Sequence, residues 1–151
     1  MRIFLGLALA LPTSADDNEL PKKAGEAFAA AKEFELYSLD PNSQEKGREK
    51  FHGWHILGKT LLKGEDLIKV RDAVEKGRKE SNGDVAGCFS PRHGIRIVQE
   101  KVTIDLVICF ACLSATVFDG ETRIGAFLTT HAPGPILKDV LIAANVPVPT
   151  K

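Results

Sequence analysis

The chain has 151 residues, of which 44% are hydrophobic and 26% charged, and its 20 Lys and Arg balance its 20 Asp and Glu. This hydrophobic content excludes a disordered chain, and the length favours one domain over two large ones. Zero net charge argues against nucleic-acid binding through phosphate contacts, which needs a basic surface. The sequence contains no phosphate-binding loop, dinucleotide fingerprint, nucleophile elbow or HExxH motif, so it indicates no particular enzymatic activity.

Residues 1–15 have the pattern of a secretory signal peptide. Arg2 precedes the apolar run 3–11, and Ala15 is a small residue at the expected cleavage position. This run is too short to span a bilayer, which requires about 20 residues, and no later segment forms an uncharged apolar run of that length. We therefore expect an exported protein, periplasmic or extracellular, with no transmembrane segment in the mature chain. The alternative is an ordinary apolar N-terminal helix.

The region after the signal divides into a leader, 16–33, and a main domain, 34–151. The Ala-rich run 21–33 predicts a short helix with Phe28 as its apolar anchor. In the main domain, the surest helix begins at residue 64 and ends near residue 81. Its apolar residues recur at helical spacing and form one face: Leu67, Val70, Ala73 and Val74.

The remaining elements of the main domain are mostly strands, with one further helix over 135–144. The expected strands are 34–39, 54–62, 85–89, 94–99, 102–110, 113–118 and 123–129. The links between the later strands are short, so neighbours along the chain should pair antiparallel. The sequence therefore predicts an α+β fold, with a single antiparallel meander of four to five strands and helices packed on one face.

Three cysteines and a histidine form the only cluster of chemically distinctive residues. Cys88, His93, Cys109 and Cys112 lie on strands that the meander would place side by side. Three thiolates and one imidazole are a known ligand set for zinc, and soft ligands also suit copper. Residues three apart on a regular strand lie about 10 Å apart on opposite faces. The predicted metal site therefore needs a bulge or bend between Cys109 and Cys112.

A structural disulfide is the main alternative to a metal site. An extended strand would keep the Cα atoms of Cys109 and Cys112 farther apart than the roughly 7 Å that a disulfide allows. A cross-strand bond from Cys88 to either of them fits better and leaves one odd thiol. A thioredoxin-like redox pair is disfavoured because no helix is expected after Cys112. Inert buried thiols are the last alternative.

Arg92 and His93 lie next to each other in the segment SPRHG, which we expect to form a hairpin loop. A guanidinium offers a two-pronged hydrogen-bond donor, and an imidazole can donate, accept or carry a proton. The pair could therefore bind a carboxylate or phosphate, which makes a small anionic ligand one predicted partner. The alternative is a solvated loop tip, since loops are exposed by default.

Two further polar groups call for a structural explanation. Asp105 lies inside an apolar strand, where an unpaired carboxylate would be costly to bury, so we expect it to face solvent or to pair with Arg96 or Lys101. His52 and His55 have a spacing seen in metal sites, but short motif matches of this kind are weak. We therefore favour a packing role for both histidines.

The segments FELYSLDP, FHGW, CFSPRHGI and DLVICFAC together resemble an uncharacterised family of small exported bacterial proteins, over residues 34–118. The specific part of the resemblance is CFSPRHGI with ICFAC, and it implies no activity. The leading hypothesis is therefore an exported, non-enzymatic protein that binds a metal ion or a small ligand. The alternative is a disulfide-stapled module that binds an unknown protein through the SPRHG loop.

Overall fold

The computed structural model describes residues 18–42 and 46–150; the predicted export signal, 1–15, lies outside them. Within these ranges no helix has the length and apolar content needed to cross a membrane. The described elements are α1 (Lys22–Ala30), β1 (Glu33–Asp40), β2 (Lys50–Phe51), β3 (Trp54–Lys63), α2 (Gly64–Lys79), β4 (His93–Gln99), β5 (Val102–Cys109), β6 (Ser114–Asp119), β7 (Thr122–Leu128) and α3 (Pro133–Ala143).

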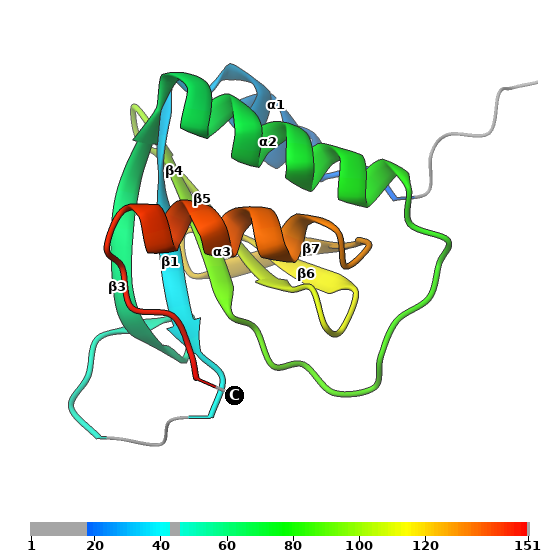
Figure 1. The fold of residues 1–151 in the computed structure, drawn as a ribbon. Helices are drawn as coiled ribbons and strands as arrows, with labels where there is room; N and C mark the ends of the chain where they lie inside the picture. The colour runs from blue at the N-terminus through cyan, green and yellow to red at the C-terminus, as the bar shows by residue number, and fades with distance from the viewer. Residues whose placement is uncertain (1–17, 43–45, 151) are drawn as a thin grey trace, which may run out of the picture.

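The strands form one antiparallel sheet in the order β2-β3-β1-β4-β5-β6-β7 (Figure 1). The α+β class and the single antiparallel sheet are confirmed. The predicted size of four to five strands is wrong, because the described part of the sheet has seven. The meander β4 to β7 is extended by β1, which pairs with β4 on one side and with β3 on the other.

The strand expected at 85–89 does not form. Residues 81–92 are instead an irregular loop between α2 and β4, most of it exposed. The edge of β4 that this strand would have used is occupied by β1, with Leu36 opposite Ile95. His93 begins a strand as expected, but Cys88 and His93 do not flank a hairpin.

The three helices of the described ranges cover one face of the sheet, as predicted (Figure 1). The predicted apolar face of α2 is buried there. Phe28 of α1 is also fully buried in this cluster, which confirms its role as the anchor of the short N-terminal helix. Because α1 packs into the same hydrophobic cluster as the strands, it contributes to the core rather than only leading into it.

The opposite face of the sheet carries a smaller cluster, covered by the β2–β3 hairpin rather than by a helix. Phe51 stacks on Tyr37 with ring centroids 4.5 Å apart, and it lies over Gly94 of β4. A Cβ atom at Gly94 would stand 2.6 Å from the Phe51 ring, so this approach requires glycine. At the hairpin tip the ring of His52 stacks on Phe118 at 3.8 Å.

The crossing of α2 and the start of α3 generates a prediction for Gly77→Ala. A Cβ atom at Gly77 would lie 2.5 Å from Pro133 Cγ and 2.6 Å from Thr129 Oγ1. We expect overpacking to lower the free energy of unfolding by about 1–3 kcal/mol, measured by urea denaturation.

Gly25→Ala in α1 is the matched control. Its new Cβ would meet only Leu20 Cβ, at an ordinary 3.6 Å, and alanine is the better helix former by about 1 kcal/mol. Stability should therefore stay equal or rise. Equal stabilities for Gly77→Ala and the unsubstituted protein would show that the helix crossing is not as tight as described.

Candidate functional site

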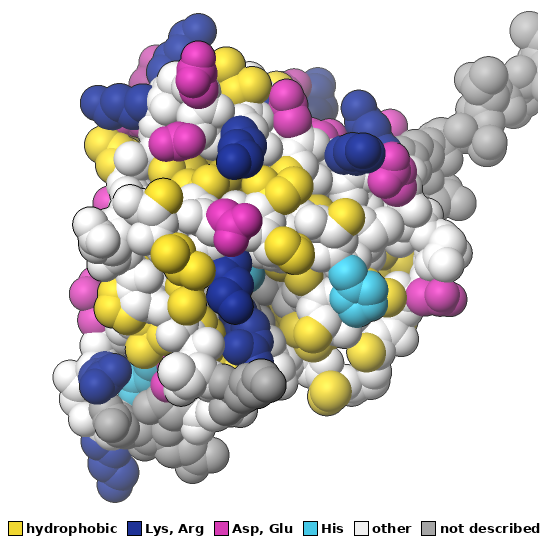
Figure 2. All heavy atoms as spheres, viewed as in Figure 1, with side chains coloured by type: hydrophobic (Ala, Val, Ile, Leu, Met, Phe, Trp, Pro, Cys, Tyr) yellow, Lys and Arg dark blue, Asp and Glu magenta, His cyan; other side chains and the backbone are white. Residues whose placement is uncertain are grey.

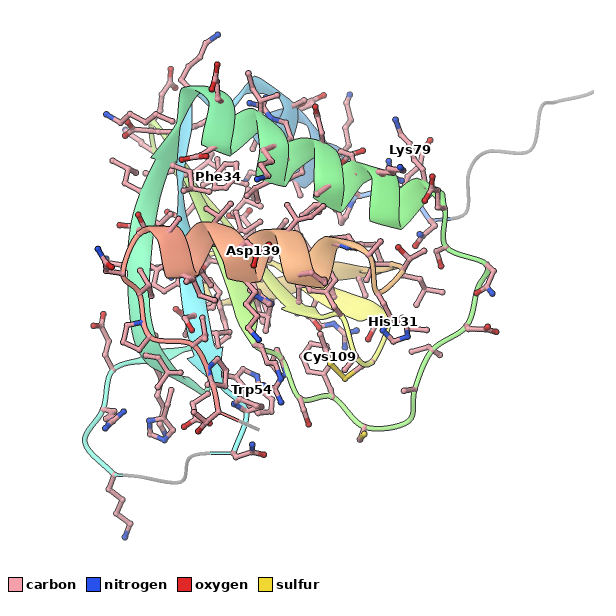
Figure 3. The ribbon with its side chains drawn as sticks, in the orientation of Figure 1. Phe34, Trp54, Lys79, Cys109, His131 and Asp139 are labelled. Atoms are coloured by element: carbon pink, nitrogen blue, oxygen red, sulfur yellow. A yellow bond between two sulfur atoms is a disulfide. The ribbon has the colours of Figure 1, made fainter. Side chains whose placement is uncertain are left out.

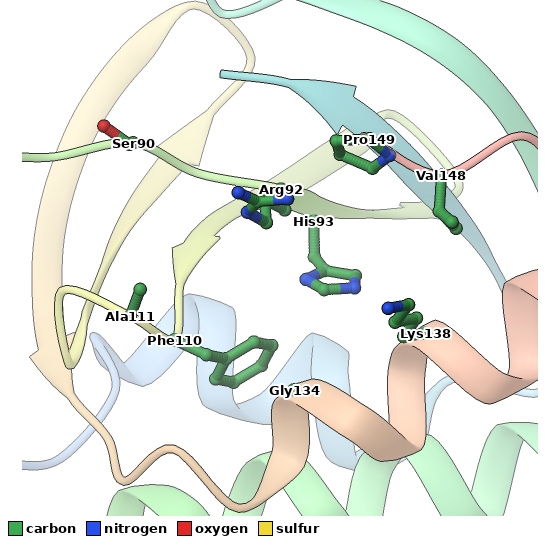
Figure 4. A pocket seen from close by; sticks show the side chains of 9 residues that line it. All are labelled: Ser90, Arg92, His93, Phe110, Ala111, Gly134, Lys138, Val148 and Pro149. Atoms are coloured by element: carbon green, nitrogen blue, oxygen red, sulfur yellow. The ribbon is translucent and has the colours of Figure 1, made fainter. Parts of the chain in front are cut away.

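A pocket of about 260 Å³ lies where the start of β4, the turn after β5, the first turn of α3 and the C-terminal segment meet. Figure 4 shows the ring of His93 near its centre, between Phe110 and Lys138. The lining combines charged, neutral polar and apolar groups. Its residues are Ser90, Arg92, His93, Phe110, Ala111, Gly134, Lys138, Val148 and Pro149.

His93 supplies the buried polar group of the pocket. It is the first residue of β4, is 8% exposed, and its ring centroid lies 5.4 Å from that of Phe110. Burial, with further contributions from the positive charges of Arg92 and Lys138, lowers the pKa of His93 to about 4. The imidazole is therefore neutral near pH 7, where it presents one N–H donor and one acceptor nitrogen.

Two cations flank this neutral ring. Arg92 immediately precedes β4, and its carbonyl accepts a hydrogen bond from the backbone N–H of Leu39 at 2.9 Å, which fixes the backbone at the pocket. Lys138 follows the buried Leu137 on α3, so its side chain comes from the helix edge that borders the pocket. In Figure 2, Lys and Arg side chains gather on this side of the molecule just below α3, among hydrophobic neighbours.

The C-terminal segment forms the apolar side of the pocket. Val146 is buried against β3, where a Cβ atom at Gly58 would come within 2.9 Å of it. This close packing holds the following residues, Val148 and Pro149, against the pocket. The pocket therefore has a positively charged side, a neutral imidazole and an apolar wall.

The disulfide pairing in the structure differs from the one expected from the sequence. Cys109 and Cys112 form a disulfide, with Cα atoms 5.1 Å apart, although a bond between them was not expected. The reason is that β5 ends at Cys109 and the chain turns at once, with Leu113 at a φ of 61°. The expected cross-strand bond is wrong, since Cys88 is free and exposed.

The predicted metal ligands are not assembled in the described structure. Two of the three sulfurs are bonded to each other, Cys88 lies in the exposed loop, and His93 faces the pocket. In the described ranges no group of three or more His, Cys, Asp or Glu side chains is placed to hold a metal ion. Zinc or copper binding by Cys88, His93, Cys109 and Cys112 stays a prediction, and it requires the thiolates of a reduced protein.

The predicted pair of ligand-binding residues, Arg92 and His93, does line one pocket. Sequence reasoning missed Lys138, Val148 and Pro149, which reach the pocket from the last helix and the tail. The sequence holds no short-range signal for these contacts, because they depend on how α3 is placed against the sheet. Phe110 could have been suspected, since it lies between the two cysteines that the motif singled out.

Asp105 lies away from this pocket, on the face with the smaller cluster. Its carboxylate is fully buried and accepts two hydrogen bonds from Arg96, each 2.8 Å, which confirms the predicted pairing. His52 Nε2 lies 2.6 Å from the same carboxylate. The hydrogen bonds with Asp105 raise the pKa of Arg96 further above its usual range. This network explains how an aspartate can occupy an apolar strand.

Comparisons of the chain with family models, with curated proteins and with solved structures find no match. The residues of the pocket are therefore the basis for inferring a function.

The buried imidazole predicts how stability changes with pH. His93 takes up a proton only near pH 4 in the folded protein, whereas its usual value is 6.5. Between these pH values His93 binds more protons in the unfolded chain than in the folded protein, so its contribution lowers the free energy of unfolding as the pH falls from about 6.5 to about 4. The difference between the two pKa values of His93 corresponds to about 3 kcal/mol in the free energy of unfolding.

His93→Gln should remove this contribution and flatten the pH dependence of stability over that window. Urea unfolding at pH 7.5, 6, 5 and 4 measures it. The control is His131→Gln, since His131 is exposed, and it should retain the pH dependence of the unsubstituted protein. An unchanged slope in His93→Gln would contradict the assigned burial of this ring.

Proposed function

We propose that this protein is an exported, non-enzymatic binding protein for a small anionic ligand, held in the pocket formed by Arg92, His93 and Lys138. The observation that carries the proposal is the convergence of two cations and a buried neutral imidazole on one concave site with an apolar wall. Sites of this kind, mostly apolar with a few convergent polar groups, are typical of small-ligand binding.

The charges favour an anion over a cation or a neutral ligand. The positive charges of Arg92 and Lys138 add to burial in disfavouring protonation of His93, so both side chains contribute a positive potential at the pocket. A carboxylate placed there would accept a charge-assisted hydrogen bond from the guanidinium, while the neutral His93 could donate its N–H.

The apolar wall limits the shape of the ligand. About 260 Å³ is slightly below the usual range for drug-sized ligands, so a compact molecule fits best. Phe110 and Pro149 offer flat apolar surfaces on which a small ring could lie. A monocarboxylate with a compact hydrophobic body matches both the charge and the wall.

Isothermal titration with benzoate tests this proposal, with benzyl alcohol as the uncharged comparison. We expect benzoate to bind and benzyl alcohol to bind at least tenfold more weakly. Arg92→Gln and Lys138→Gln should each weaken benzoate binding by about fivefold to tenfold, the loss expected for a partly solvated charged contact.

Lys69→Gln is the control, because it removes one positive charge from the exposed side of α2, away from the pocket. It should leave benzoate affinity unchanged. Equal binding of benzoate and benzyl alcohol, or equal losses in Lys69→Gln and Arg92→Gln, would overturn an anion site at this pocket.

A protein-interaction module is the second candidate function, supported by the exposure of the loop 81–92. Val85 is an apolar side chain that is 58% exposed near its middle. The predicted contact segment SPRHG is less suitable, because Pro91 and His93 are buried. Two variants distinguish these candidate functions. Val85→Asp should abolish partner binding and leave benzoate affinity unchanged. Arg92→Gln should weaken benzoate binding and leave partner binding unchanged.

A further inference from the structure

The loop that carries the third cysteine is anchored to the disulfide-bonded Cys112 on both sides of Cys88. The backbone N–H of Ala86 donates to the Cys112 carbonyl at 3.0 Å, and that of Ser90 donates to Cys112 Sγ at 3.2 Å. Cys88 lies midway between these two anchors, so its Cα is within roughly 7 Å of each anchored residue along the chain. Its thiol is free and exposed. Figure 3 shows the disulfide at Cys109, on the side of the molecule where this loop passes.

Both sulfurs of the disulfide receive backbone N–H groups. Besides the bond from Ser90 to Cys112 Sγ, the N–H of Cys112 donates to Cys109 Sγ at 3.1 Å. When the bond is opened, such donors stabilise a sulfur that leaves as a thiolate, and a stable thiolate leaves faster in thiol–disulfide exchange. The Ser90 carbonyl lies 3.4 Å from Cys109 Sγ, where it could accept the S–H of the reduced cysteine.

The disulfide is closed to solvent and encloses little chain. Cys109 is 1% and Cys112 3% exposed, so the surrounding residues obstruct direct attack by an external thiol on either sulfur. A bond that encloses only two residues constrains the unfolded chain less than one that closes a long loop. The bond therefore stabilises the folded chain less than a disulfide that closes a long loop, and an internal thiol could reach it more easily than one from solvent.

We propose that Cys88, Cys109 and Cys112 form a thiol–disulfide exchange site, with Cys88 as the exposed thiol through which external thiols reach the buried bond. In the first step the Cys88 thiolate attacks Cys112 Sγ. A Cys88–Cys112 bond forms, the Cys109–Cys112 bond breaks, and the electron pair leaves on Cys109, which takes up a proton from solvent in place of the one Cys88 lost. This step is redox-neutral and needs no co-reactant.

The next steps transfer two electrons from an external thiol. An external thiolate attacks Cys88 Sγ in the exposed loop and forms a mixed disulfide, while Cys112 leaves as a thiolate and is protonated. A second external thiolate then attacks the external sulfur, which releases the external disulfide and regenerates Cys88. In sum, two external thiols become one disulfide, and Cys109 and Cys112 become two thiols. The substrate class is therefore thiols and, in the reverse direction, disulfides.

The decisive experiment is the rate of reduction by β-mercaptoethanol, an uncharged thiol whose reaction involves no anion binding. Alkylation at timed intervals and intact mass count the free thiols. The single Trp54 gives an independent signal, because its ring centroid lies 6.2 Å from that of Phe89 in the same loop. We expect Cys88→Ser to be reduced at least tenfold more slowly than the unsubstituted protein, with the same final equilibrium because Cys88 is regenerated.

Val85→Ser is the matched control, since it changes the same exposed loop and keeps the thiol. It should be reduced at the unsubstituted rate. If Cys88→Ser is reduced as fast as Val85→Ser, the exchange site is overturned. That result would not bear on the proposed anion-binding pocket.

A trapping variant tests the intermediate. In Cys109→Ser the Cys109–Cys112 bond cannot form. An external disulfide, 2-hydroxyethyl disulfide, should therefore oxidise Cys88 and Cys112 to a bond with each other, which leaves no alkylatable thiol and lowers the mass by two hydrogens. Circular dichroism establishes that the variant is folded. Two alkylatable thiols in a folded Cys109→Ser protein would show that Cys88 does not reach Cys112 and would overturn the relay; if the variant does not fold, the Cys88→Ser rate decides alone.

Discussion

The reversal of the chain between β5 and β6 is the constraint on which the pocket end of the molecule depends. The chain turns within the four residues from Cys109 to Cys112, and the disulfide holds the ends of this turn together. From the turn, Cys112 holds the long loop through Ala86 and Ser90. The carbonyl of Leu113 accepts a hydrogen bond from Thr129, at the end of β7. One turn thus fixes the loop before β4, the sheet edge and the approach to α3.

The sheet can carry this arrangement because buried side chains pack against both of its faces. Three helices cover one face, while the β2–β3 hairpin covers part of the other. On the hairpin side, burying the Asp105 carboxylate without partners would cost folding free energy. The carboxylate instead accepts hydrogen bonds from Arg96 and lies within hydrogen-bond distance of His52. Since His52 comes from the hairpin tip, this pairing links the hairpin to the middle of the sheet. The polar network is therefore better explained as a link between layers than as a second reactive site.

Sequence patterns predicted the local elements well and the long-range pairings poorly. The spacing of Leu67, Val70 and Val74 identified α2, because helical periodicity depends only on residues that are close in sequence. The position of β1 beside β4 joins segments some 60 residues apart, and no local pattern encodes it. The loop containing Val85 has the apolar residues of a strand, but β1 already satisfies the hydrogen bonds of β4 that it would have used.

The candidate site divides in the same way. Arg92 and His93 are adjacent in sequence and could be paired from it, whereas Lys138 arrives from another element. A bond between Cys109 and Cys112 was not predicted because the apolar run around them resembles one continuous strand, whereas the chain turns after Cys109. An apolar run shows which residues can be buried, but it does not show where the backbone reverses.

The pocket and the cysteine group are distinct in chemistry but share part of their framework. Phe110 and Ala111 are the two residues enclosed by the disulfide, and Ser90 is the residue that its sulfurs contact; all three line the pocket. Opening the Cys109–Cys112 bond removes the covalent restraint on Phe110, whose ring packs beside His93. Because close-packed side chains transmit displacements to their neighbours, we expect the state of the disulfide to affect the shape of the pocket wall.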